Sequence, residues 1–141
     1  MAKKDINEIL TEVANAPTED DKINILKFNS SLPLQMVIQG AFHPGIQWVI
    51  NEPPKYRASS APAGLGYQTI SSSHTKFYLW RKDNPDVSPN VTQERKEILL
   101  IQLLESMEEH EAETTVNMML KDLKVPGLTY SVAKKAFPEL F

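Results

Sequence analysis

Apolar residues recur three and four positions apart over most of the chain, the spacing that places side chains on one face of a helix. The longest such stretch runs from Thr92 to Met107, where Thr92 is a suitable N-cap and polar residues fill the first turn. Because Leu100 closes much of the polar gap, this helix is apolar over most of its circumference. We therefore predict that it forms the centre of the core, covered by the N-terminal helices and by residues 127–141.

The N-terminal third has the pattern of three short helices, each preceded by a residue whose side chain can cap it. Asp5 precedes the first, Thr18 the second, and Ser30 or Ser31 the third, in which Pro33 suits an early helical position. The connections between them are short, which favours compact packing. The predicted helices end near residue 15, near residue 29 and between residues 42 and 45.

The middle of the chain, about residues 43–73, differs in kind. It holds four prolines and three glycines, which exclude regular helix over most of its length. Ile46, Trp48 and Ile50 alternate with other residues and fit either one short strand or an extended packed segment, but no second strand is evident to pair with them. Residues 52–56 are expected to be extended and polyproline-like.

Further helices are predicted in the second half. Ser71 to Ser73 are candidate caps for a helix over residues 74–83, and residues 108–110 mark a break after the central helix. Another amphipathic helix covers residues 112–123, a turn follows at 125–127, and Thr129 caps a last short helix that Pro138 closes. Leu140 and Phe141 are expected to fold back onto the core. The predicted fold is mainly α: one domain, residues 1–141, with six to seven short helices and a long irregular insertion.

Composition narrows the class of protein. The chain has 141 residues, 41% of them hydrophobic and 23% charged, as is typical of a globular protein. It contains no cysteine, which excludes disulfides and thiolate chemistry. The N-terminus lacks the apolar region of a secretory signal, and no apolar run approaches the length of a membrane span. We expect a protein that acts inside a cell or in a virion, without a membrane.

Charge is distributed unevenly along the chain, although the net charge is only −3. Residues 44–82 carry five basic and one acidic side chain, whereas both flanking segments are acidic. Such a basic middle fits either a patch that binds a partner or charge complementarity between packed segments of the same molecule.

Catalytic and metal-binding motifs are not found. The sequence has no phosphate-binding glycine loop, no zinc-protease motif and no nucleophile elbow, and its three histidines are far apart. The densest group of ionisable residues, Glu105 to Glu113, is interpreted as a solvated corner between helices. We therefore expect no catalytic residue, no metal and no cofactor.

One constellation supports a functional hypothesis. Aromatic and basic residues are interleaved between positions 48 and 82, as in surfaces that bind proteins and in surfaces that stack unpaired bases. The remaining alternative is that these rings belong to the core. The candidate partner-binding residues are Trp48, Lys55, Tyr56, Arg57, Tyr67, Lys76, Tyr78 and Arg81.

Several segments resemble a family of small uncharacterised proteins of tailed bacteriophages, frequent in marine myoviruses. They are LLESM at 103–107, the Glu111–Ala112 pair, GLTYSVAKKAFPELF at 127–141, and Phe42-His43-Pro44 with residues 46–50 and the following proline pair. The resemblance implies a phage protein made in the cytoplasm of a bacterial host, and it assigns no functional residue.

The pattern and the resemblance together favour a non-enzymatic phage accessory or assembly protein that acts through protein contacts. The partner, viral or host, is not identified by the sequence, and neither is the oligomeric state. The alternative is an accessory factor that binds single-stranded nucleic acid through residues 48–82. Either protein is expected in the host cytoplasm, with the virion as a second location.

Overall fold

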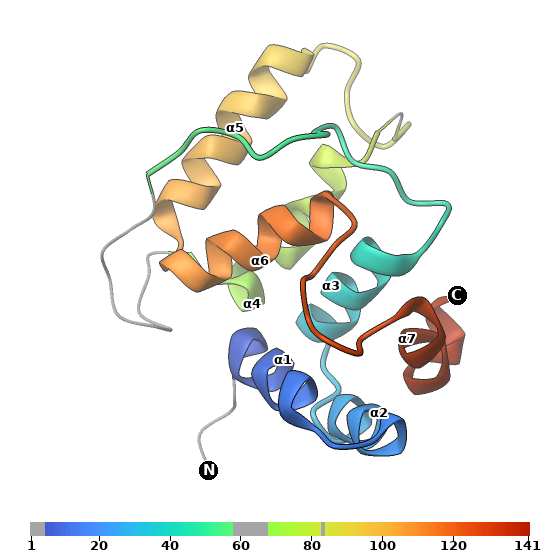
Figure 1. Cartoon of the computed structure of the whole chain (residues 1–141). Coiled ribbons are helices and arrows are strands. Elements are labelled where there is room, and N and C mark those ends of the chain that lie inside the picture. The colour runs from blue at the N-terminus through green and yellow to red at the C-terminus, as the bar shows by residue number, and fades with distance from the viewer. Residues whose placement is uncertain (1–4, 58–67, 83) are drawn as a thin grey trace.

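Short capped helices make up most of the chain in a computed structural model that describes residues 5–57, 68–82 and 84–141 (Figure 1). These residues form seven α-helices, two 3-10 helices and no strand, which confirms the mainly α fold. The elements in chain order are α1 (Ile6–Asn15), α2 (Glu19–Phe28), α3 (Leu32–Phe42), α4 (Ile70–Ser73), η1 (His74–Trp80), α5 (Gln93–Ser106), α6 (Glu109–Met119), α7 (Tyr130–Ala136) and η2 (Pro138–Leu140).

The first three helices begin where their capping residues predict. Asp5 accepts a hydrogen bond from the backbone N–H of Glu8, and Thr18 and Ser31 cap α2 and α3 in the same way. Each cap satisfies one of the N–H groups that a helix leaves unpaired in its first turn. The predicted helices of the N-terminal third are confirmed.

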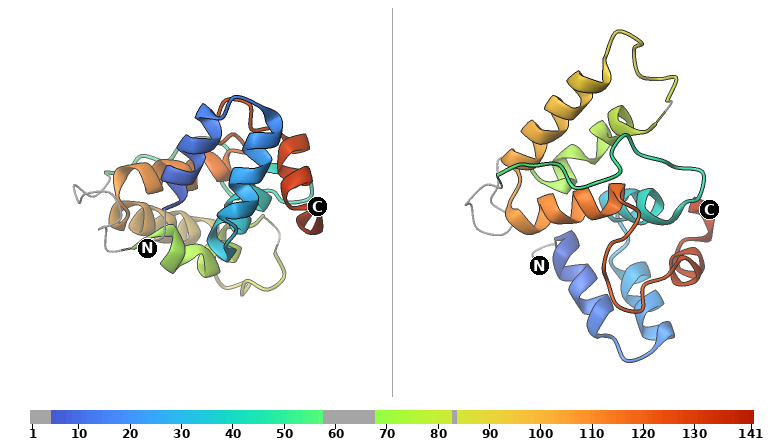
Figure 2. Two further views of the ribbon diagram at one scale, coloured as in Figure 1. Left: turned by 90° about the horizontal axis from the view of Figure 1, so that it is seen from below. Right: turned by 45° about the horizontal axis from the view of Figure 1, so that its top comes forward.

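The centre of the core is α6, and not the helix that the sequence favoured. Eight of the eleven residues of α6 are buried, and the helix packs against α1, α3 and α5. Figures 1 and 2 show α6 between α5 on one side and α1 and α2 on the other. The prediction that residues 92–107 form the centre was wrong, because α6 buries polar side chains that make its sequence look like a surface helix.

The helix α5 lies at the periphery and is covered on three faces by different neighbours. Leu100 and Leu104 face the core, whereas the stripe from Leu99 to Ser106 faces η1. A third stripe, with Glu97 and Ile101, faces the extended segment at residues 49–55. Burial on several sides is therefore confirmed, but the neighbours are η1, α6 and this segment rather than the N-terminal helices and residues 127–141.

The irregular middle is held to the end of η1 by two backbone hydrogen bonds. The N–H of Val49 donates to the carbonyl of Trp80 at 2.8 Å, and the N–H of Lys82 donates to the carbonyl of Gln47 at 2.8 Å. They make a single antiparallel bridge between Trp48 and Arg81. Of the two alternatives for this segment, the extended packed form is the one observed among the described residues.

The helical region around residues 70–80 starts earlier than predicted, and most of it is a 3-10 helix rather than an α-helix. Thr69, rather than one of the three serines, caps α4, and it forms a reciprocal capping box with Ser72. From His74 to Trp80 the chain continues as a 3-10 helix. The prediction of an α-helix over residues 74–83 was therefore wrong in its start and in its hydrogen-bond pattern.

The C-terminal segment folds back as predicted. Gly127 turns the chain with φ of 76°, and Thr129 caps α7. Gln39 donates to the carbonyl of Leu140 at 3.0 Å, and the ring of Phe141 stacks on His43 with 5.9 Å between the centroids. Within the described residues, no helix is long and apolar enough to cross a bilayer.

Candidate functional site

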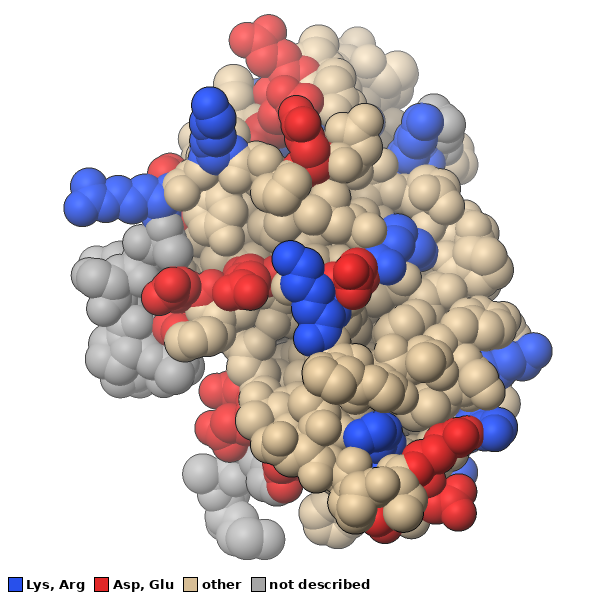
Figure 3. All heavy atoms as spheres, viewed as in Figure 1, with Lys and Arg blue, Asp and Glu red and all other residues tan. Residues whose placement is uncertain are grey.

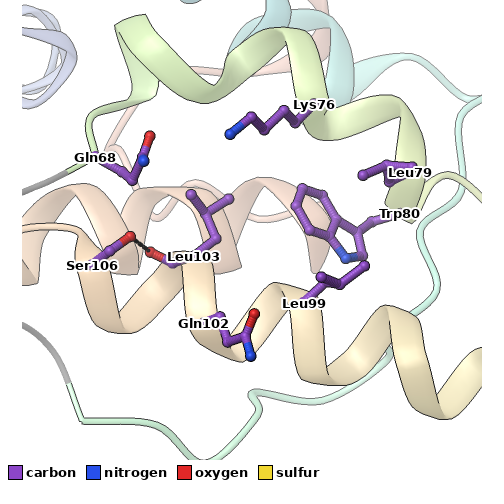
Figure 4. Close-up of a pocket in the computed structure, with 8 residues that line it drawn as sticks. All are labelled: Gln68, Lys76, Leu79, Trp80, Leu99, Gln102, Leu103 and Ser106. Carbon is purple, nitrogen blue, oxygen red and sulfur yellow. Dashed lines mark hydrogen bonds between the residues drawn. The ribbon is translucent and has the colours of Figure 1, made fainter.

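A groove runs between η1 and α5 on the side of α5 opposite the extended segment (Figure 4). Its volume is about 330 Å³. We call it the η1 groove, and the described residues that line it are Gln68, Lys76, Leu79, Trp80, Leu99, Gln102, Leu103 and Ser106.

The upper wall of the η1 groove follows from the period of the 3-10 helix. Three residues per turn place positions i and i+3 in line. Phe77 and Trp80 make the buried row, and Lys76 and Leu79 make a more exposed row. The groove is lined by this second row together with Trp80. The indole of Trp80 donates to the carbonyl of Lys96 at 2.9 Å, which fixes the ring against α5.

The lower wall is one stripe of α5. Leu99, Gln102, Leu103 and Ser106 stand at i, i+3, i+4 and i+7, so they share one face of the helix. Figure 4 shows the Leu103 side chain rising from α5 between Gln68 and the ring of Trp80. The hydroxyl of Ser106 donates to the carbonyl of Leu103 at 2.7 Å and is thus engaged within its own helix.

The two ends of the groove differ in polarity. Leu79, Trp80 and Leu99 gather at one end, and Gln68 stands at the other, with the ammonium of Lys76 extended toward it (Figure 4). The side-chain oxygen of Gln68 accepts a hydrogen bond from the hydroxyl of Ser73 at 3.1 Å. No carboxylate and no histidine line the groove among the described residues. This arrangement suits binding and offers no pair of nucleophile and base.

Three of the predicted contact residues lie on η1 or directly after it. Lys76 is exposed over the η1 groove, Tyr78 is 43% exposed on the outer row, and Arg81 is half-buried. The amide of Asn84 donates to the carbonyl of Tyr78 at 3.1 Å and ties down the end of the 3-10 helix. The structure thus keeps Lys76, Tyr78 and Arg81 within one short segment, with Lys76 and Tyr78 on different rows of η1.

Trp48 belongs to the core instead. Its ring is only 5% exposed, and its indole donates to the carbonyl of Gly40 at 2.9 Å. The alternative that these rings belong to the core is therefore correct for Trp48. The bridge to Arg81 draws residues 47–49 inward over α3 and α6.

Lys55, Tyr56 and Arg57 lie away from the η1 groove. Lys55 lines the hollow on the opposite face of α5, and the N–H of Arg57 donates to a carboxylate oxygen of Glu105 at 3.2 Å. Burial first, and then the nearby charges of two glutamates of α6, raise the pKa of Tyr56. These three residues therefore lie beside acidic side chains of the same molecule. Tyr67 lies outside the described residues.

The surface charge matches this local pairing. Among the described residues on the face drawn in Figure 3, acidic and basic side chains are interspersed. The basic middle of the sequence therefore does not gather into one patch on that face.

The acidic segment at residues 105–113 is not simply a solvated corner. Glu105, Glu109 and Glu113 are exposed, but Glu108 and Glu111 are buried. Glu108 caps α6 and accepts hydrogen bonds from the N–H groups of His110 and Glu111 and from the His110 ring. The prediction was wrong for these two residues for different reasons. Glu108 caps its own helix through local hydrogen bonds, whereas Glu111 accepts the N–H of Ile70, which only the fold brings near. No group of acidic and histidine side chains within the described chain could hold a metal ion.

The pKa values of the two buried glutamates shift in opposite directions, because burial dominates at one and hydrogen bonds dominate at the other. Burial raises the pKa of Glu111, whose one oxygen accepts the N–H of Ile70 at 3.2 Å while the other has no partner among the described residues. Burial also opposes ionisation of Glu108, but the hydrogen bonds from residues 110 and 111 prevail and lower its pKa. The contact with Glu108 raises the pKa of His110. Glu108 is thus held by hydrogen bonds at the start of α6, and Glu111 by the hydrogen bond from Ile70.

Sequence reasoning missed most of the groove residues. Gln68, Gln102 and Ser106 carry no motif, and Leu79 and Leu99 look like ordinary core residues. The available signal was the i, i+3, i+4, i+7 stripe in α5, which contains two polar residues within an apolar helix.

A family model covers residues 9–125, from α1 to the turn after α6, and so includes every residue that lines the η1 groove. The chain belongs to DUF6433, a family of unknown function. The match stops before α7, so the motif at residues 127–141 lies outside it. No curated protein matches the chain. Family membership therefore assigns no activity to the groove.

Proposed function

We propose that the protein is a non-enzymatic phage accessory or assembly protein that acts through protein contacts made by the η1 face, the surface formed by the η1 groove and the exposed Tyr78. The observation that carries the proposal is the η1 groove, where apolar side chains lie beside the exposed Lys76, with Tyr78 exposed on the outer row of the same 3-10 helix. Exposed aromatic residues next to basic ones and a partly apolar depression are typical of protein interfaces.

The phage origin rests on the resemblance of residues 42–54, 103–107 and 127–141 to proteins of tailed phages. It implies synthesis in the cytoplasm of a bacterial host, with incorporation into the virion as the other location. A viral or a host protein is the partner in this proposal.

Catalysis is not part of the proposal. The only hydroxyl among the described groove residues, that of Ser106, already donates to a backbone carbonyl and has no base beside it. Glu108 accepts backbone hydrogen bonds at the start of α6, and Glu111 accepts the N–H of Ile70 at the start of α4.

Binding of single-stranded nucleic acid through residues 48–82 is the alternative. It needs aromatic rings and basic side chains along one continuous path. Burial of Trp48 and the separation of Lys55, Tyr56 and Arg57 from the η1 face favour protein contacts over this alternative. Single-strand binding that weakens steeply with salt would support the alternative.

The test compares two double variants by affinity purification from infected cells. Lys76→Glu with Tyr78→Ala changes a lysine and an aromatic ring on the η1 face. Lys27→Glu with Phe28→Ala makes the same changes at the end of α2, where Phe28 is 86% exposed. We expect the η1 variant to lose a co-purifying protein at least tenfold, at an unchanged melting temperature, and the α2 variant to retain it. The reverse result would place the contact at the α2–α3 corner and contradict the proposal.

A further inference from the structure

The η1 groove has the size and polarity to accept a particular kind of protein segment. We propose that it receives a large apolar side chain with a carboxylate directly beside it, presented by an acidic segment of the partner. This inference rests on the proposed function, because it names the chemistry of the partner for the same surface.

Size excludes larger occupants. A groove of about 330 Å³ is at the lower end of the range of ligand sites, roughly 300–1,000 Å³. It can hold one or two side chains, but it is too small for a dinucleotide or for the whole face of a helix. The partner therefore inserts an anchor residue, as interface hot spots commonly do.

The apolar end fits the body of that anchor. The half-buried side chains of Leu79 and Leu99 supply the accessible apolar surface here, next to Trp80 and Leu103, which are buried (Figure 4). Trp80 is fixed by its hydrogen bond to Lys96, so its position does not depend on an occupant. A preformed apolar surface binds an apolar side chain without the cost of ordering the site first.

The polar end fits a carboxylate. Lys76 is exposed and forms no ion pair with the described residues, and its ammonium extends toward Gln68 (Figure 4). Ser73 holds the side-chain oxygen of Gln68, and the amide N–H groups of Gln68 have no partner among the described residues, so they can donate to an incoming acceptor. An ammonium and an amide donor at one end of the groove can bind the two oxygens of a carboxylate.

Charge favours this groove over other hollows in the described structure. The hollow beside the start of α1 is lined by Asp5, Glu8 and Glu108, and the hollow beside residues 49–55 contains Glu52 and Glu97 against one lysine, Lys55. A third hollow, between α1 and α6, has Lys124 but also Glu113. Each of these hollows therefore contains at least one carboxylate that opposes an acidic segment. The η1 groove has a lysine and no described carboxylate, so electrostatic complementarity directs an acidic partner to it.

The direct test is an NMR titration of the ¹⁵N-labelled protein with N-acetyl-phenylalanine, which carries the apolar group and the carboxylate together. We expect the indole N–H signal of Trp80 to shift with a Kd of about 1 mM, as is usual for a fragment of this size. The indole of Trp48 is buried elsewhere and serves as an internal control that should not move. N-acetyl-phenylalanine amide, which lacks the charge, should bind about tenfold more weakly.

Variants then separate the two ends of the groove. Lys76→Ala and Gln68→Glu should each weaken binding of N-acetyl-phenylalanine about tenfold and leave binding of its amide nearly unchanged. Lys27→Ala, at an exposed lysine on α2, is the matched control and should bind as the wild type does. Equal binding of the acid and the amide, or equal shifts of both indoles, would overturn the inference.

Other occupants give different results. A shift of the Trp80 signal by an eight-residue oligothymidylate, without a shift by N-acetyl-phenylalanine, would assign the groove to nucleic acid and overturn the inference. A Trp80 shift that depends only on protein concentration would assign it to a second copy of this chain, with the same consequence.

The inference and the proposed function fail in different ways. If the η1 double variant loses its partner but N-acetyl-phenylalanine does not bind, the contact surface stands and the inferred anchor is wrong. If N-acetyl-phenylalanine binds as expected but no partner is lost, the groove chemistry stands and the proposed function is wrong.

Discussion

The ammonium of Lys121 lies 2.7 Å from the carbonyl oxygen of His43, 78 positions earlier in the chain. It also donates to the carbonyls of Gly40 and Ile46 at 3.0 and 2.9 Å. One side chain thereby satisfies carbonyls at the end of α3 and fastens the chain after α6 to the start of the irregular segment. A cation at the C-terminus of a helix also interacts favourably with the helix dipole.

Removal of this ammonium should destabilise the fold. We expect Lys121→Ala to lower the free energy of unfolding by about 2–3 kcal/mol, because three carbonyls lose a charged donor. Lys124→Ala is the matched control, since Lys121 and Lys124 have similar left-handed backbones, with φ of 63° and 57°. Lys124 is exposed, so its change should stay within about 0.5 kcal/mol. Urea denaturation measures both, and equal losses would show that the backbone rather than the ammonium matters.

The approach of α3 to α6 depends on the absence of a side chain at Gly40. A Cβ there would lie 2.8 Å from a ring carbon of Trp48 and 2.9 Å from the sulfur of Met118, both of which are buried. We expect Gly40→Ala to cost about 1–3 kcal/mol of stability. Gly45 is exposed, and a Cβ there would meet only the ring of the half-buried His43. Gly45→Ala should therefore have a much smaller effect than Gly40→Ala when both are compared by thermal melting.

The apolar residues of α5 should differ sharply in their contribution to stability. Leu104 is fully buried, and we expect Leu104→Ala to cost about 2–5 kcal/mol. Ile98 is 40% exposed although its sequence context is just as apolar, so Ile98→Ala should cost less than about 1 kcal/mol. Similar losses from both changes, measured by urea denaturation, would mean that α5 is buried on all sides and that its peripheral position is wrong.

Stability should decrease as pH rises above the acidic range. Burial, with Asp5 and Glu108 nearby, raises the pKa of Glu111, so the folded state holds this proton more tightly than the unfolded chain. The resulting stability is complete below the ordinary pKa of a glutamate and is lost as pH rises through the folded value. The raised pKa of His110 likewise gives stability that is lost as pH rises through the folded-state pKa of this histidine. The lowered pKa of Glu108 gives stability that is present above the ordinary pKa of a glutamate and is lost only as pH falls below it.

The variant that tests this is Glu111→Gln, whose amide oxygen can still accept the N–H of Ile70. We expect it to be more stable than the wild type at pH 8 and to show a flatter dependence of urea midpoint on pH between 5 and 8. Glu113→Gln, at an exposed position on the same helix, should retain the wild-type dependence. An unchanged slope in Glu111→Gln would show that this carboxyl does not govern the effect.

Part of the candidate site followed from the sequence and part did not. The interleaved aromatic and basic residues pointed to η1, where Lys76 and Tyr78 are exposed. The same pattern included Trp48, which is buried because its indole finds the Gly40 carbonyl, a contact between segments that spacing does not reveal. The facing wall of the groove on α5 could not be located either, because its residues become a wall only where η1 packs across them.

Local chemistry alone determined the helical fold and most helix boundaries. Asp5, Thr18, Ser31, Thr92 and Thr129 cap the helices they precede because the bonds they make reach only three residues along the chain. Tertiary structure decided which helix is central. The sequence of α6 is rich in Glu, Thr and Asn, and such residues can be buried only if partners satisfy them. Glu111 finds Ile70, and Thr114 finds Asn7, 107 positions away. Pairings over such distances depend on the packed fold, so α6 rather than the more apolar α5 became the core.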